Sequence, residues 1–236
     1  VAAEAASLAG HLALDNLTIL YDSNEVTLDA MANASQSESV IDRFTAYGYH
    51  CIRVEGGHDM EEIGHALAQA RANKGKPTFI EFKTLIAKGI PEVAGTAGGH
   101  GEGGAKFAES ARLGLGLPEE PFYVSDEVRG FFQQRTAEQV ENRKRWNETF
   151  QAWRAANPEK AALLDSGLKR EVPADLMDRV QVFPEDAKVA TRAAGGQVIN
   201  DLAKAMPLLV SGSADLHGST KNYLKEEGDF SAENPT

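Results

Sequence analysis

The sequence predicts a three-layer α/β/α fold, in which a mainly parallel sheet lies between helices, plus the start of a second similar domain. Three observations support this prediction. Short apolar segments alternate with helical segments through residues 1–85, a long polar helical stretch follows, and a new helix and apolar segment begin near residue 190. Because parallel strands are joined by crossovers, usually helices, this alternation favours a parallel sheet with both faces covered.

The first half contains six expected elements, assigned from composition and apolar periodicity. Asp59 and Glu62 have the spacing of a capping box, which indicates the start of one helix. Thr, Phe and Ile are frequent in the last strand, as is typical of strands. In chain order the elements are a helix over about 2–14, a strand over 17–21, a helix over 38–47, a strand over 49–54, a helix over 59–72 and a strand over 77–85.

The second half is polar and helical before it turns to α/β again. A helix over 125–156 carries an apolar stripe that we expect to pack against a domain, formed by Phe131, Phe132, Trp146, Phe150 and Trp153. Pro158 stands at the first position of a short helix, where proline is tolerated. A further helix is expected over 192–205 and a strand over 207–211. The expected domains are 1–166 with its helical extension, a proline-containing linker over 167–188, and the beginning of a truncated domain over 189–236.

The charge balance disfavours several classes of function. Lys and Arg number 24 against 35 Asp and Glu, which gives a net charge of −11. An acidic surface repels phosphate backbones and anionic lipids, so we expect neither nucleic acid nor membrane partners. No apolar run reaches the roughly 20 residues of a membrane span. One cysteine excludes an internal disulfide and fits a reducing cytosol.

Asn24 follows the first expected strand and is a candidate metal ligand. An amide oxygen suits a hard divalent cation, and the backbone carbonyl of Val26, two residues on, could supply a second oxygen. Diphosphate oxygens would complete an octahedron around Mg²⁺. Taken alone, an Asn at this place is also typical of a simple turn.

A glycine-rich loop with a central histidine follows the third expected strand. Six of the ten residues over 95–104 are glycine, which suits close approach of the backbone to a ligand. The imidazole of His100 could donate a hydrogen bond to a phosphate or to a substrate oxygen. A mobile surface loop with an incidental histidine would have the same composition.

Arg192 and Ser219 are the candidate phosphate-binding residues of the second half. A guanidinium fork together with a hydroxyl suits a sugar phosphate dianion. Their spacing alone does not bring them together in space.

Taken in order, these segments resemble the transketolases. The second half of that family's thiamine-diphosphate motif matches Leu20–Val26, and its Gly-Asp-Gly half, with a metal-binding Asp, would lie before Val1. Both ends of the chain are therefore expected to be cut. The other matching segments are Ser7–Gly10, Phe44–His50, Gly57–Asp59, Thr84–Ala87, His100–Gly101 and Gly212–Leu216.

The resemblance implies roles for individual residues. It implies that Asn24 binds the diphosphate and Mg²⁺, Ca²⁺ or another divalent cation, with the Val26 carbonyl as a further metal ligand. It implies a catalytic role for His100, in contact with the diphosphate and the substrate. It also places Ile86 against the cofactor, Asp215 near the thiazolium ring, and Arg192 and Ser219 on the substrate phosphate. Two stretches depart from the common family pattern, 99–104 around the histidine and 218–220 around Ser219.

The implied function is that of a cytoplasmic, homodimeric transketolase of the pentose phosphate pathway, with active sites at the subunit interface. Such an enzyme transfers a two-carbon ketol unit from a ketose phosphate to an aldose phosphate. The 236 residues alone are expected to have no turnover. The alternatives are a dihydroxyacetone synthase, a deoxyxylulose phosphate synthase, or a non-catalytic binding subunit with the same fold. Arg192 and Ser213–Leu216 favour transketolase over the deoxyxylulose phosphate synthase.

Overall fold

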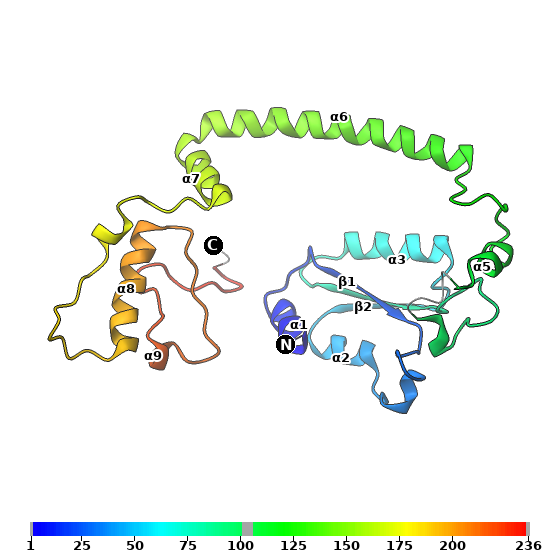
Figure 1. Cartoon of the computed structure of the whole chain (residues 1–236), viewed down its shortest axis with the longest axis horizontal. Coiled ribbons are helices and arrows are strands. Elements are labelled where there is room, and N and C mark those ends of the chain that lie inside the picture. The colour runs from blue at the N-terminus through cyan, green and yellow to red at the C-terminus, as the bar shows by residue number, and fades with distance from the viewer. Residues whose placement is uncertain (1, 101–105, 235–236) are drawn as a thin grey trace. The chain divides into compact units, whose positions relative to one another are not determined.

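The computed structural model describes residues 2–100 and 106–234, and the chain divides into two compact units (Figure 1). The first unit is Val1–Val124 with Phe230–Thr236, and the second is Ser125–Asp229. This division follows compactness, and the domain boundaries expected from the sequence stay a prediction. None of the described helices is long and apolar enough to cross a membrane.

A parallel sheet forms the centre of the first unit. Its strands are β1 (Thr18–Ser23), β2 (His50–Val54) and β3 (Thr78–Lys83), in the order β1-β3-β2. The central strand β3 is buried from Thr78 to Phe82, as expected for a strand covered on both faces. The register sets Ser23 of β1 beside Lys83 of β3, so the carboxyl ends of these two strands meet at one edge. The predicted α/β fold with a parallel sheet is confirmed.

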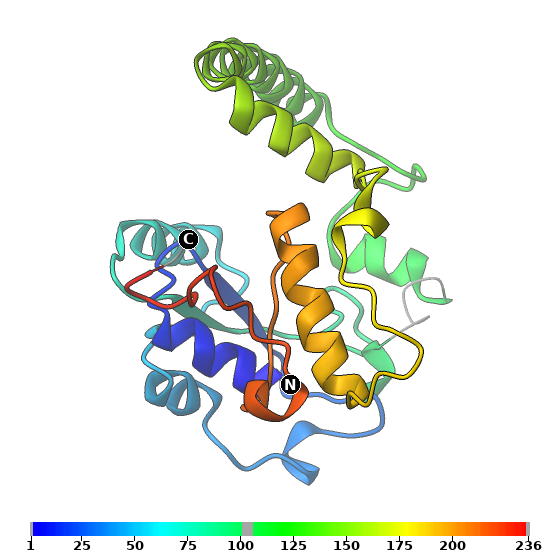
Figure 2. The same ribbon diagram turned by 90° about the vertical axis from the view of Figure 1, so that its left-hand side faces the viewer.

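Helices cover both faces of the sheet (Figures 1 and 2). On one face α3 (Met60–Ala72) packs its small residues Ala66 and Ala70 against Ile80 and Phe82. On the other face lie α1 (Ala2–His11) and α2 (Val40–Ala46), whose Phe44 ring stacks on Phe79 with ring centres 3.9 Å apart. The sheet and its two helical layers thus form the expected three-layer arrangement.

The start of α3 shows which part of the predicted capping box forms. The Asp59 carboxylate accepts hydrogen bonds from the backbone N–H groups of Glu61 (2.8 Å) and Glu62 (3.2 Å). This satisfies two of the donors that a helix start leaves free. The Glu62 carboxylate accepts from the Gly56 N–H at 3.0 Å, so it stabilises the turn before the helix.

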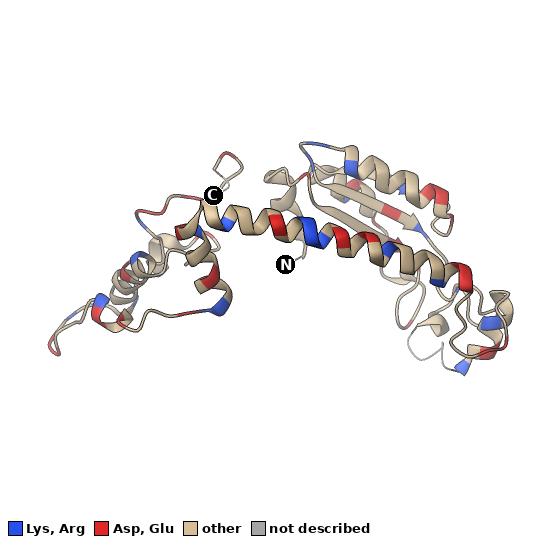
Figure 3. Cartoon of the chain, turned by 90° about the horizontal axis from the view of Figure 1, so that it is seen from above, with Lys and Arg blue, Asp and Glu red and all other residues tan. Residues whose placement is uncertain are grey.

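The remaining elements are helical and mostly short. Among them α6 begins at a Ser125 cap and has Lys, Arg, Asp and Glu interspersed along its length (Figure 3). Pro158 opens the next helix at the tolerated position. The elements are η1 (Ala32–Ala34), η2 (Ala97–Gly99), α5 (Ala108–Gly114), α6 (Asp126–Ala156), α7 (Pro158–Lys169), η3 (Leu176–Arg179), α8 (Thr191–Ala205) and α9 (His217–Thr220).

Two expectations for the second unit are wrong. The segment 207–211 forms turn and irregular backbone instead of a strand, because no described strand lies beside it to pair with its N–H and C=O groups. The aromatic stripe of α6 is also largely uncovered, with Phe131 58%, Phe132 63% and Trp146 51% exposed. Trp146, Phe150 and Trp153 stack on one another along the helix, with ring centres 5.0 and 5.7 Å apart.

Candidate functional site

The loop after β1 folds around the side chain of Asn24. The Val26 N–H donates to the Asn24 Oδ1 at 3.0 Å, and the Asn24 amide donates to the Asp22 carboxylate at 3.4 Å. Glu25 between them has a φ of +61°, a left-handed conformation that costs a non-glycine residue about 1–2 kcal/mol. The turn interpretation of Asn24 therefore holds, and the turn is a defined and strained one.

This turn still leaves oxygen atoms for a ligand. An amide oxygen has two lone pairs, and Val26 uses one of those on Asn24. Among the described residues, no backbone hydrogen bond ends on the Val26 carbonyl oxygen. The Asn24 amide oxygen and the Val26 carbonyl oxygen could thus still bind a hard cation, which prefers oxygen ligands.

Lys83, at the end of β3, and Thr84, just after it, join β1 and the Asn24 loop to the central strand of the sheet. The Thr84 hydroxyl donates to the Asp22 carboxylate, and the Thr84 N–H donates to the Ser23 carbonyl at 3.4 Å. The Lys83 ammonium donates to the Ser23 hydroxyl at 3.1 Å and to Glu25 at 3.3 Å. The end of β3 is therefore bonded to the loop after β1 through Glu25, and Thr84, just after β3, is bonded to the end of β1.

The glycine-rich loop folds back against Ile86 and Ala87, and Gly99, the residue before His100, makes one of these contacts. The Gly95 N–H donates to the Ile86 carbonyl at 2.9 Å. At Gly99, an added Cβ would lie 3.0 Å from the Cβ of Ala87 and 3.4 Å from a side-chain carbon of Ile86. The backbone at this glycine thus approaches closely, and the sequence places His100 next to it.

The imidazole of His100 has an unsatisfied atom. Its Nε2 is buried and has no hydrogen-bond partner among the described residues. A buried polar atom without a partner costs free energy, and a ligand that bonds to it removes that cost. Of the stretch 99–104, which departs from the family pattern, residues 101–104 lie outside the described residues.

His58 lies in the loop after β2, and no role was predicted for it from the sequence. The Nε2 of His58 accepts a hydrogen bond from the Leu85 N–H at 2.8 Å, which means that a neutral ring carries its proton on Nδ1. The Gly57 N–H donates to the Lys83 carbonyl at 3.1 Å. Both contacts fix the start of the loop that leads to His100. Its position could have indicated a role, because His58 lies in the loop after the carboxyl end of β2, four residues beyond Val54.

The second unit holds the other predicted site residues. Arg192 lies in the first turn of α8, and Ser219 lies in α9, which packs against α8. Both side chains are exposed. Asp215, also exposed, has a left-handed φ of +61°.

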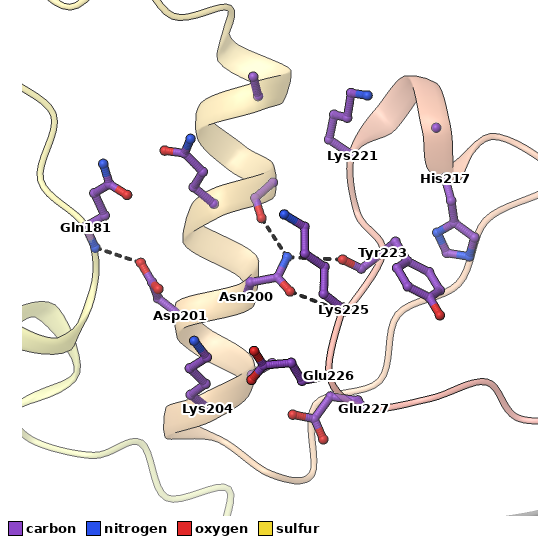
Figure 4. Close-up of a pocket in the computed structure, with 15 residues that line it drawn as sticks. Gln181, Asn200, Asp201, Lys204, His217, Lys221, Tyr223, Lys225, Glu226 and Glu227 are labelled. Atoms are coloured by element: carbon purple, nitrogen blue, oxygen red, sulfur yellow. Dashed lines mark hydrogen bonds between the residues drawn. The ribbon is translucent and has the colours of Figure 1, made fainter.

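A cavity of about 730 Å³ lies between α8 and the segment that follows α9 (Figure 4). The Asn200 amide donates to the carbonyls of Gly196 at 2.8 Å and Tyr223 at 3.1 Å, and its oxygen accepts from the Lys225 N–H at 3.0 Å. These bonds use both N–H donors of the amide and one of the two lone pairs of its oxygen. Neither Arg192 nor Ser219 lines the cavity, although their chain neighbours Ala193 and Gly218 do.

Comparison with known proteins decides the family. Residues 1–173 match the family model described as the thiamine diphosphate binding domain of transketolase. The chain belongs to the transketolase family. Its curated relatives include the transketolases of Physarum polycephalum, at 52% identity over 99% of this chain, and of Geobacillus stearothermophilus, at 44% over 98%.

Solved transketolase structures agree with this membership. The structure from Leishmania mexicana has a TM-score of 0.89 at 33% identity and covers 98% of this chain and 35% of its own. The one from Campylobacter jejuni has a TM-score of 0.82 at 31% identity, also over 98% of this chain. The chain spans 35% of the length of the two curated relatives named above. The predicted family and fold are confirmed, and the roles of single residues stay predictions.

Proposed function

We propose that the first unit binds thiamine diphosphate through a divalent cation at the carboxyl ends of β1 and β3. The observation that carries this proposal is the pair of loops that follow these strands. One presents the oxygens of Asn24 and Val26, and the other leads to His100, whose Nε2 has no hydrogen-bond partner among the described residues. In parallel sheets ligands bind outside the carboxyl ends of the strands, which is where both loops lie.

The donor set fits a cation that arrives with a phosphate ligand. Among residues 2–100 and 106–234, no cluster of three His, Cys, Asp or Glu side chains could hold a metal ion by itself. Mg²⁺ is typically bound by few protein groups together with phosphate oxygens. Asn24 and Val26 would supply protein oxygens, and diphosphate oxygens would supply others. Ca²⁺ or another hard divalent cation would fit the same oxygens.

Three residues would orient the cofactor and substrate. His100 would donate from Nε2 to a diphosphate or substrate oxygen and stabilise negative charge that develops there, which is its proposed catalytic role. Ile86 would form an apolar wall beside the cofactor, and Asp215 would lie near its thiazolium ring. When bound, the cofactor would supply the nucleophilic carbon for breaking a carbon–carbon bond next to a ketone.

The whole protein is proposed to be a transketolase that acts on sugar phosphates. It would move a two-carbon ketol unit from a ketose phosphate to an aldose phosphate in the pentose phosphate pathway. Arg192 and Ser219 are proposed to bind the substrate phosphate, since both side chains are exposed and available. A cytoplasmic homodimer with active sites at the subunit interface is part of the proposal, with neither nucleic acid nor membrane as partner.

Cofactor titration of the full-length protein tests the metal site. Thiamine diphosphate is titrated by calorimetry with and without Mg²⁺, for the parent, Asn24→Ala and the control Asn147→Ala, an exposed residue of α6. We expect Mg²⁺-dependent binding that Asn24→Ala weakens about tenfold or more and that the control leaves unchanged. Equal affinity of parent and Asn24→Ala, or binding without Mg²⁺ dependence, contradicts the proposed site.

A panel of donors and acceptors separates the proposed activity from related ones. A transketolase combines a ketose phosphate donor with an aldose phosphate acceptor, whereas a dihydroxyacetone synthase or a deoxyxylulose phosphate synthase would use a different donor–acceptor pair. The curated relatives described above are transketolases, which favours the first outcome. Arg192→Met should raise the KM for phosphorylated substrates and leave cofactor affinity unchanged. Failure to bind the cofactor at all would instead favour a non-catalytic subunit.

A further inference from the structure

Lys83 is the last residue of β3, and its ammonium lies against both neighbours of Asn24. Its Nζ donates to the Ser23 hydroxyl at 3.1 Å and to the Glu25 carboxylate at 3.3 Å. One side chain on the central strand thus contacts the residue before and the residue after the proposed metal ligand. The ammonium therefore limits how far either flank of Asn24 can move.

A buried carboxylate holds this ammonium in place. Glu81 lies two residues earlier on β3, on the same face of the strand, and its side chain is 5% exposed. Its Oε1 is 3.5 Å from the Lys83 Nζ, and its Oε2 accepts from the Arg53 Nε on β2 at 2.8 Å. A buried carboxylate without a charged partner costs free energy, so breaking its contact with either Lys83 or Arg53 is unfavourable. The hydrogen bond with Glu81 also raises the pKa of Arg53.

The contacts of Lys83 differ in strength. Glu25 is 69% exposed, so solvent and salt weaken its contact with the ammonium. Ser23 and Glu81 are buried, and the Lys83 side chain is 30% exposed, so those two contacts are screened less. The ammonium has three N–H donors, of which two bond to Ser23 and Glu25, and the Glu81 carboxylate forms an ion pair with it at 3.5 Å. These three contacts keep the Lys83 ammonium among protein groups.

We propose that Lys83 is a positioning residue, which holds the Asn24 loop in the conformation that binds the cation and touches neither the cation nor the diphosphate. The inference rests on the proposed function, because it concerns the same site. It adds a chain of contacts from β2 through β3 to the end of β1 and the loop after it, formed by Arg53, Glu81 and Lys83. This chain sets the strained turn at Glu25 before any ligand arrives.

The test compares three substitutions in the full-length protein. Lys83→Met removes the charge and keeps the length, and Lys83→Arg keeps a cation. Lys76→Met is the matched control, an exposed lysine just before the opposite end of β3. Thiamine diphosphate is titrated by calorimetry at fixed Mg²⁺. We expect Lys83→Met to weaken binding about tenfold, Lys83→Arg to recover most of the affinity, and Lys76→Met to match the parent.

Two further measurements separate positioning from other roles. Without cofactor, hydrogen exchange of the Val26 amide should be faster in Lys83→Met than in the parent, because this amide bonds to the Asn24 oxygen. At saturating cofactor, kcat should stay near the parent value. Parental cofactor affinity together with unchanged Val26 exchange would overturn the inference. A fall in kcat at unchanged affinity would also overturn it, since Lys83 would then act on the chemistry.

Two outcomes need separate treatment. If Lys83→Met does not fold, Ser23→Ala removes one acceptor of the same ammonium and must shift affinity and Val26 exchange in the same direction. No shift in either would overturn the inference. If the parent does not bind thiamine diphosphate, the proposed function fails, and Val26 exchange still decides whether Lys83 orders the loop.

Discussion

Side chains at the ends of the three strands bond first to one another and leave particular atoms for a ligand. Asn24 closes its own turn with one lone pair and keeps another, and the Nε2 of His100 has no described partner. Asp22, by contrast, accepts from both Asn24 and Thr84. The atoms available to a ligand are therefore those that have no hydrogen bond to a neighbouring residue. Substitutions at two other places in the chain test how much a single contact contributes to stability.

The first prediction concerns Asp165, which pairs with Arg154 between α7 and α6 through bonds of 2.8 and 2.6 Å. The hydrogen bond with Arg154 lowers the pKa of Asp165 below its ordinary value of 3.8. Because the folded pKa is lower, the pair stabilises the protein fully above pH 3.8, and this contribution is lost as the pH falls through the lowered pKa. Urea unfolding, followed by tryptophan fluorescence at several acidic pH values, measures the effect.

Asp165→Asn is the comparison for that measurement. The variant lacks the titrating group, so its stability should fall less steeply than that of the parent in the acidic range. The pair is only partly buried, with Arg154 29% and Asp165 40% exposed, and the difference should therefore be small. Parallel acid dependence of the two proteins would show that the pair contributes nothing to stability.

The second prediction concerns Gly57, whose backbone lies against the carboxyl end of β3. A Cβ added there would lie 2.3 Å from the Lys83 carbonyl oxygen, so Gly57→Ala forces the backbone apart. We expect a loss of about 1–3 kcal/mol in the free energy of unfolding, measured with urea. Gly64→Ala is the control, because an added Cβ in α3 meets nothing within 4 Å. It should raise stability by about 0.5–1 kcal/mol.

At the scale of elements, β3 determines where the site forms. It is hydrogen-bonded on both edges, and Phe79 and Ile80 point to opposite faces with 1% and 0% exposure. Lys83 and Thr84, at and just beyond its carboxyl end, bond to the last residues of β1, and Lys83 also bonds to Glu25 in the loop that follows. The long polar helix α6 has no buried aromatic residue. Trp146 and Phe150 stack on each other, and Phe131, Phe132 and Trp146 are more than half exposed.

The third prediction compares these two elements. Phe79→Ala should reduce the free energy of unfolding by about 3–5 kcal/mol, because it removes a ring packed against Tyr21 and Phe44. Phe131→Ala, at an exposed position of α6, should change it by less than about 0.5 kcal/mol. Urea denaturation of both variants measures the difference. A similar loss for both would mean that Phe131 is covered in solution.

At the scale of the whole molecule, each unit has its own packing. The first unit has two apolar clusters, one on each face of the sheet, while the described part of the second unit has helices and irregular segments without a strand. Stability should therefore differ along the chain, since local opening is rare where apolar burial is greatest.

The fourth prediction follows from that difference. Native-state hydrogen exchange, read by mass spectrometry, should be slowest for the amides of β3 and faster for those of α6, which has no buried residue. Peptides from α3 serve as an internal reference, because this helix covers the sheet with Ala66 and Ala70. Exchange of β3 as fast as that of α6 would contradict the burial seen in the structure.

Local features of the sequence were sufficient to predict most elements and the family. Asp59 and Pro158 start helices through contacts within a few residues, and the buried run of β3 shows in its composition. The turn at Asn24 also depends on near neighbours. By the same reasoning a strand was predicted at 207–211, and this was wrong, because a strand needs a pairing partner that local sequence does not reveal.

The sequence by itself determined the alternation of helices and strands, the caps, and the residue types at the strand ends. Only the tertiary structure decided that Lys83 reaches Ser23, 60 residues away, and that His58 accepts from Leu85, 27 residues away. The physical reason is range. A cap or a turn is stabilised by neighbours along the chain, whereas these contacts exist only after β1, β2 and β3 have paired in register and brought their carboxyl ends together.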